Sequence, residues 1–140
     1  MKTFLRLLFF VSIVLLFSCE ELGTLVVNCS DCKTEEPKKT RLEIKINPSE
    51  FCPVQIDIYE GEVGDSIIYS SFLTCGSVTE SIVPLNKKYT VTATYNINQK
   101  KYIAIDATTP RVRFEKDQCE EPCYFVYNRR VNLKLKVIHQ

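Results

Sequence analysis

The chain has 140 residues, of which 45% are apolar and 25% charged, and its formal net charge is +1. This composition is typical of one globular domain, and it excludes a disordered chain, a collagen-like chain and a strongly basic nucleic-acid-binding protein. A single histidine, His139, and four glycines leave little material for imidazole chemistry or for phosphate-binding loops. The seven cysteines are therefore the most informative residues of the sequence.

The first eighteen residues have the organisation of a secretory signal peptide. Lys2 and Arg6 supply positive charge, and an apolar run of about a dozen residues follows at 7–17. That run is shorter than a typical membrane-spanning helix. An ordinary signal peptide and a retained transmembrane anchor stay open as interpretations of this segment alone.

The apolar run ends in Leu16-Phe17-Ser18-Cys19, which resembles the lipobox of bacterial lipoproteins, although Phe17 departs from the usual small or aliphatic residue. The resemblance implies that residues 1–18 are removed and that Cys19 becomes the mature N-terminus, with lipid on its sulfur and its amine. Residues 19–28 would then form the lipid anchor and a short tether. Two acyl chains are enough to hold a protein stably at a membrane.

The acidic pair Glu20-Glu21 resembles the surface-export signal of lipoproteins from the Bacteroidetes group. The resemblance implies an outer-membrane protein, lipid-anchored and exposed on the cell surface. Removal of residues 1–18 leaves 16 basic and 17 acidic side chains, a net charge of −1. The mature chain therefore gives no electrostatic reason to expect nucleic acid or anionic lipid headgroups as partners.

A two-residue alternation of apolar and polar side chains dominates the mature chain and predicts half-buried β-strands. The alternation is clearest at 41–46, 54–58, 89–95 and 131–137. Further strands are expected at 22–27, 66–72, 77–83, 101–107, 111–114 and 123–127, separated by turn residues at 47–49, 60–65, 84–86, 96–98 and 128–129. The sequence thus predicts an all-β domain at 29–140, a single antiparallel, Ig-like β-sandwich of about eight to ten strands.

Residues 54–107 resemble the transthyretin-like or carboxypeptidase-regulatory-like sandwich family. The matching residues are Ile58-Tyr59-Glu60-Gly61, the segment 83–93 with its Pro-Leu-x-x-x-Tyr-x-Val-x-Ala pattern, and Lys101-Tyr102-Ile103-Ala104. The whole chain also resembles small Bacteroidetes lipoproteins of unknown function. Both resemblances imply a topology, and neither implies an active site.

Six cysteines remain after Cys19, and an even number in an exported protein of this size predicts a disulfide framework. If 54–58 and 66–72 form a hairpin, Cys52 and Cys75 lie almost opposite each other, within disulfide reach. We therefore predict a Cys52–Cys75 disulfide.

The other four cysteines form two close pairs, Cys29-x-x-Cys32 and Cys119-x-x-x-Cys123. Pairing within a motif needs a turn, because residues three apart in a strand are about 10 Å apart. Pairing between the motifs is slightly favoured, since it closes a loop of about 90 residues and stabilises the fold by roughly 4–5 kcal/mol in the entropy model. A four-thiolate zinc site and a redox-active Cys-x-x-Cys are the alternatives. An oxidising compartment argues against zinc. A redox-active Cys-x-x-Cys normally opens a helix that lowers the thiol pKa, and the sequence indicates no helix there.

The sequence contains no recognisable catalytic or cofactor-binding motif, so no cofactor or bound metal is expected. We expect a non-enzymatic surface lipoprotein that acts as an accessory, scaffold or adhesion module beside a protein partner in the outer membrane. Tyr59, Tyr69 and Tyr127 could lie on outward faces, where exposed tyrosines can stack on sugar rings, so a glycan-binding lipoprotein is the first alternative. A carboxylate-dependent hydrolase is the second, and it needs two acids held across a cleft.

Overall fold

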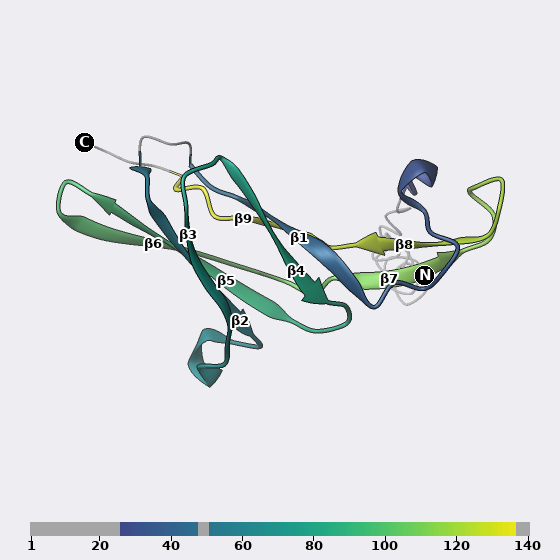
Figure 1. Ribbon diagram of the computed structural model, residues 1–140, viewed down its shortest axis with the longest axis horizontal. Coiled ribbons are helices and arrows are strands. Elements are labelled where there is room, and N and C mark those ends of the chain that lie inside the picture. Colours follow the sequence, from purple (N-terminus) through teal and green to yellow (C-terminus); the bar gives the residue numbers. More distant parts are fainter. Residues whose placement is uncertain (1–25, 48–50, 137–140) are drawn as a thin grey trace, which may run out of the picture.

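The computed structural model describes residues 26–47 and 51–136. Strands dominate these residues, with short 3-10 turns at Cys29–Asp31 (η2) and Val63–Asp65 (η4) (Figure 1). The strands are β1 (Lys39–Lys45), β2 (Val54–Glu60), β3 (Ile68–Thr74), β4 (Val78–Pro84), β5 (Tyr89–Ile97), β6 (Lys100–Thr108), β7 (Arg111–Glu115), β8 (Cys123–Tyr127) and β9 (Arg130–Asn132). The predicted all-β fold is confirmed.

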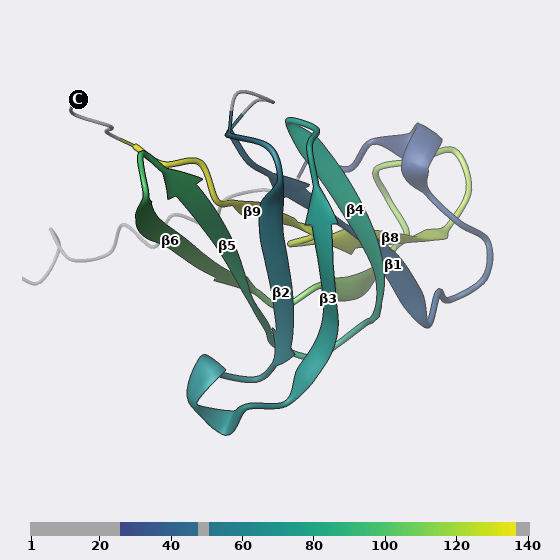
Figure 2. The ribbon, with the colours of Figure 1, turned by 60° about the vertical axis from the view of Figure 1, so that its left-hand side comes forward.

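Two sheets face each other and form the sandwich. One has the strand order β3-β2-β5-β6, and the other has the order β4-β1-β9. Figure 2 shows the four-stranded sheet in front of the smaller one. The hairpin β7–β8 forms a separate two-stranded ribbon, which extends beyond the sandwich on the right of Figure 1. This ribbon matters for function, because it carries the C-terminal pair of cysteines.

The core lies between the two sheets and is built from the apolar half of each alternating strand. Because successive side chains of a strand point to opposite faces, every second residue reaches the interior. The inner residues of the four-stranded sheet include Val54, Ile56, Ile58, Tyr89, Val91, Ala93 and Tyr95, and those of the smaller sheet include Leu42, Ile44, Val83 and Val131. The predicted alternation at 41–46, 54–58 and 89–95 therefore marks the core correctly.

One pair of strands departs from the antiparallel prediction. Among the described strands, β1 and β9 pair in parallel, with Glu43, Ile44 and Lys45 beside Arg130, Val131 and Asn132. A parallel neighbour needs a long connection rather than a tight turn. Here nearly the whole domain lies between the two strands, and no local signal in the sequence can reveal such a pairing.

The predicted strand at 131–137 is too long. Regular pairing ends at Asn132, because the neighbouring β1 ends at Lys45. The chain stays extended beyond that point, since the Leu133 amide donates to the Lys45 carbonyl at 2.8 Å and the Leu135 amide donates to Asn47 Oδ1 at 2.7 Å. The apolar alternation thus predicted burial of Leu133, but not the end of the ladder.

The turn predicted at 96–98 begins two residues later, at Asn98. β5 continues through Ile97, and the reversal uses Asn98 and Gln99, whose φ values are +49° and +64°. Two consecutive residues with positive φ are characteristic of the two-residue hairpin turn whose twist matches that of the strands. Asn98 suits this backbone, whereas Gln99 adopts it without the usual glycine.

The strand expected at 22–27 lies mainly outside the described residues, and Val26 and Val27 within them are not in a strand. Among residues 26–47 and 51–136, no helix has the length and apolarity needed to cross a membrane.

Candidate functional site

Two disulfides join the segment around η2 to the β7–β8 ribbon. Cys29 is bonded to Cys119 and Cys32 to Cys123, with Cα–Cα separations of 5.7 and 5.6 Å. Both bonds cross the same pair of chain segments, so they act as one double staple. We call these four cysteines the clip. The pairing between the two motifs that the sequence slightly favoured is present.

Backbone hydrogen bonds align the two segments independently of the sulfur atoms. Lys33 and Tyr124 form an antiparallel bridge, in which each amide donates to the other residue's carbonyl, at 2.8 and 2.7 Å. Each of these residues directly follows a clip cysteine. On the other side of η2, Arg129 Nη2 contacts Asp31 Oδ2 at 3.2 Å. The clip thus reinforces a strand-like docking that the main chain already makes.

Local chemistry explains why the segment turns at η2. The Asn28 side chain accepts a hydrogen bond from the Ser30 amide, which caps the turn. The Val27 amide donates to Gln118 Oε1 at 3.2 Å, and Val27 itself is buried. The sequence analysis missed Gln118, and its only sequence signal is its position next to Cys119.

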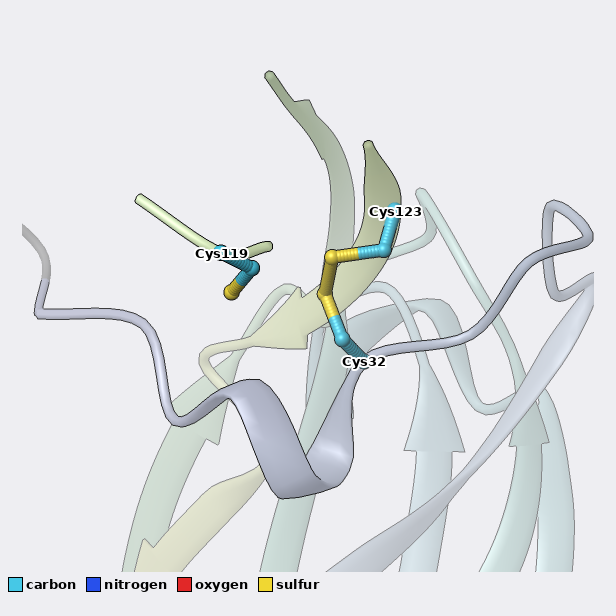
Figure 3. Close-up of side chains that lie close together, drawn as sticks. All are labelled: Cys32, Cys119 and Cys123. Carbon is cyan, nitrogen blue, oxygen red and sulfur yellow. A yellow bond between two sulfur atoms is a disulfide. The ribbon is translucent and has the colours of Figure 1, made fainter. Parts of the chain in front are cut away.

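Three sulfur atoms of the clip form a compact cluster (Figure 3). The Sγ atoms of Cys32, Cys119 and Cys123 all lie within 4.8 Å of one another, and Cys29 is bonded to Cys119. Cys29 is exposed, Cys32 and Cys119 are half-buried, and Cys123 is buried. Glu115 lies opposite Cys123 in the β7–β8 ladder; it is buried, and its carboxylate accepts hydrogen bonds from the amides of Lys116 and Asp117.

An open cleft of about 550 Å³ borders the clip. All four clip cysteines line it, together with Gln118, Pro122 and the carboxylates of Glu120 and Glu121. These two acids are adjacent in the chain and exposed, which is the environment of solvated charges rather than of a paired catalytic acid and base. The cleft gives solvent and small solutes access to the sulfur atoms.

A second cleft, of about 420 Å³, lies on the other side of η2. Its walls include Val27, Asp31, Tyr127, Asn128 and Arg129. The charged groups of Asp31 and Arg129 already satisfy each other across it. Arg130 and Phe125 also line this cleft, so its walls are of mixed polarity.

The third disulfide joins Cys52 to Cys75, with a Cα–Cα separation of 4.8 Å. It closes the end of the β2–β3 hairpin, next to the Val54–Thr74 pair of the ladder. This is the pairing that the hairpin register predicted. The bond is spatially separate from the clip, because it belongs to the sandwich rather than to the ribbon.

The three tyrosines assigned to outward faces do not form a row. Tyr59 is half-buried and alternates with the inner residue Ile58 on β2, so it faces outward. The ladder register shifts beside it, between Ile58 and Tyr59. The ring of Tyr69 packs edge-on against Tyr89, 5.7 Å between centroids, and its hydroxyl donates to the Ile82 carbonyl. Tyr69 remains 39% exposed, so one side of its ring is accessible while the other packs on Tyr89. Tyr127 lies on the separate β7–β8 ribbon.

Two other tyrosines carry shifted pKa values, and both are structural. Burial raises the pKa of Tyr89 to about 12, and the negative charge of Glu60 adds to the shift. Burial also raises the pKa of Tyr95. The Tyr95 hydroxyl donates to the Leu133 carbonyl at 2.8 Å and accepts from the Asn47 amide at 3.1 Å. Both side chains therefore act as neutral hydrogen-bond donors between the sheets.

Cys19 and His139 lie outside the described residues. A scan against protein-family models found no matching family, and searches of the curated proteins and of the solved structures found no match.

Proposed function

We propose that the chain is a membrane-anchored, non-enzymatic surface lipoprotein that serves as an accessory, scaffold or adhesion module. The observation that carries this proposal is the position of the clip. Cys19 and Cys29 are only ten positions apart in the chain, a span of at most about 35 Å when fully extended. A lipid on Cys19 would therefore hold the domain close to the membrane surface, with the ribbon covalently joined to the end of the tether.

The disulfide content supports the compartment in this proposal. Three disulfides occur within a domain of about 110 residues, a density that is usual for exported proteins and rare for cytosolic ones. The lipobox-like motif at Cys19 is the reason to propose a membrane anchor. The acidic pair that follows it is the reason to propose the outer surface of the cell. A membrane-proximal protein partner fits a domain that the tether keeps near the bilayer.

Metabolic labelling with a clickable fatty acid tests the anchor. Cells producing the wild-type chain should show a labelled band, and the Cys19→Ala variant should show none. Ser18→Ala is the matched control, since it keeps a small residue before the cysteine and should label normally. An unlabelled wild-type chain would overturn the anchor.

The surface location and the partner need separate measurements. Protease added to intact cells should degrade the domain, whereas complete protection would place it on the inner side of the membrane. Crosslinking on intact cells should recover a specific outer-membrane neighbour that is lost from the Cys19→Ala variant. Recovery of the same neighbours with and without the anchor would contradict the scaffold function.

A further inference from the structure

The four clip cysteines form two disulfides in this structure, and their arrangement also suits a reduced, metal-bound state. We propose that, when both clip disulfides are reduced, Cys29, Cys32, Cys119 and Cys123 bind one zinc ion as a tetrahedral four-thiolate site. The site does not require the lipid anchor, although it uses the same four cysteines whose disulfides support the proposed function. It joins the same two chain segments that the disulfides join.

The positions of the sulfur atoms carry this inference. A tetrahedral zinc–thiolate centre has Zn–S bonds of about 2.3 Å, which places its sulfur atoms about 3.8 Å apart. In the disulfide state, the Sγ atoms of Cys32, Cys119 and Cys123 already lie within 4.8 Å of one another. Reduction opens the two bonded pairs toward the required spacing, and Cys119 needs to approach the other two sulfurs by only about an ångström.

The backbone can hold this arrangement after the disulfides open. The reciprocal hydrogen bonds between Lys33 and Tyr124 keep the residues that follow Cys32 and Cys123 side by side without help from sulfur. The spacings Cys-x-x-Cys and Cys-x-x-x-Cys are also those with which structural zinc sites take two ligands from one short segment.

The site is reachable from solvent. The cleft of about 550 Å³ opens onto all four cysteines, and the exposed carboxylates of Glu120 and Glu121 at its rim attract cations. Cys52 and Cys75, by contrast, close the β2–β3 hairpin of the sandwich and provide only two thiols. They supply an internal control for thiols that do not belong to the site.

Conversion of the clip disulfides into four thiols needs an external reductant. Two molecules of a phosphine each reduce one clip disulfide, taking up an oxygen atom from water and leaving two thiols. Zn²⁺ then binds four thiolates, and four protons leave. Binding should therefore weaken steeply as the pH falls below the ordinary thiol range, because protons compete with the metal for sulfur.

The experiment uses the mature chain carrying Cys19→Ser, so that the anchoring thiol cannot contribute. The protein is reduced with a phosphine without oxygen and titrated with Co²⁺, and separately with Zn²⁺. We expect one equivalent of cobalt to give the visible absorption of a tetrahedral four-thiolate centre, and one equivalent of zinc to bleach it. Zinc should protect Cys29, Cys32, Cys119 and Cys123 from alkylation, as read by peptide mass spectrometry, while Cys52 and Cys75 react.

Two variants make the result specific. Cys119→Ser should lower the cobalt affinity at least tenfold, whereas the matched variant Cys52→Ser/Cys75→Ser should keep both the spectrum and the stoichiometry. Absence of the tetrahedral spectrum would overturn the proposal. Protection spread over all six cysteines would overturn it as well, because it would mean that an unfolded chain chelates the metal.

Discussion

Cys29 and Cys119 are 90 positions apart in the chain, yet their Cα atoms lie 5.7 Å apart. Cys32 and Cys123 repeat this relationship a few residues later. The first crosslink to form closes a loop of about 90 residues, worth roughly 4.6 kcal/mol in the chain-entropy model. The second then closes only a ring of about eight residues, worth roughly 2.5 kcal/mol.

This difference predicts that the two clip disulfides do not contribute additively. Cys29→Ser/Cys119→Ser alone, or Cys32→Ser/Cys123→Ser alone, should lower the free energy of unfolding by about 2.5 kcal/mol, because the remaining bond still closes the long loop. Loss of all four cysteines should cost about 7 kcal/mol, which exceeds the sum of the two double variants. Urea unfolding of the three variants measures this. Simple additivity would show that the bonds constrain separate loops.

The buried hydroxyl of Tyr95 should have a measurable effect on stability. Tyr95→Phe leaves the Asn47 amide and the Leu133 carbonyl without their partner, so we expect a loss of about 1–3 kcal/mol in unfolding free energy. Tyr69→Phe removes the hydrogen bond of a hydroxyl at an exposed site and should cost less than 1 kcal/mol. Equal effects of the two changes in urea unfolding would contradict the importance of burial.

Alkaline pH should destabilise the fold through Tyr89. Its pKa is about 12 in the folded protein, against an ordinary value of 10.0, so the unfolded chain loses the phenol proton first as pH rises. The contribution to stability is complete below pH 10 and disappears between pH 10 and 12, by roughly 2–3 kcal/mol for a shift of this size. Tyr95 acts in the same direction.

Tyr89→Phe provides the control for this alkaline effect. The variant should show a shallower fall in unfolding free energy between pH 10 and 12, because one raised phenol pKa is gone. Its tyrosinate absorbance titration should also lose one group that ionises near pH 12. A variant with the wild-type pH dependence would rule out Tyr89 as the source.

The turn between β5 and β6 offers a stabilising change. Gln99 has φ = +64°, a conformation that costs an ordinary L-residue roughly 1 kcal/mol and costs glycine nothing. Gln99→Gly creates the Asn-Gly pair preferred in such turns and should raise the unfolding free energy by roughly 0.5–1 kcal/mol. Lys100→Gly, in the adjoining strand, should lower it. Thermal unfolding of both variants compares the two positions.

Local patterns were sufficient to predict the layers of this fold. Alternation at 41–46 and 89–95 marked Ile44 and Val91 as interior, because burial of one face is a property of each strand by itself. The end of β9 and the packing of Tyr69 on Tyr89 were not predictable in this way. They depend on where β1 stops and on a register shift beside Tyr59, both of which are properties of neighbouring strands.

The disulfides show the same difference between local and long-range information. Cys52 and Cys75 flank one hairpin, so the register of that hairpin predicted their pairing. The clip depends on the bridge between Lys33 and Tyr124, two residues that no short motif connects. Spacing alone therefore left several partnerships open for Cys29, Cys32, Cys119 and Cys123.

The two disulfides of the clip also determine how the molecule would respond to mechanical load. A force pulling on Val26 from the tether would reach Cys29 first and pass through covalent sulfur bonds into the β7–β8 ribbon. β1 follows the clip in the chain, and its hydrogen bonds to β4 and β9 hold the smaller sheet together. The force would therefore not separate β1 from these neighbours directly. With the proposed lipid anchor at Cys19, the sandwich would be shielded from the strain that flowing liquid places on residues 19–28.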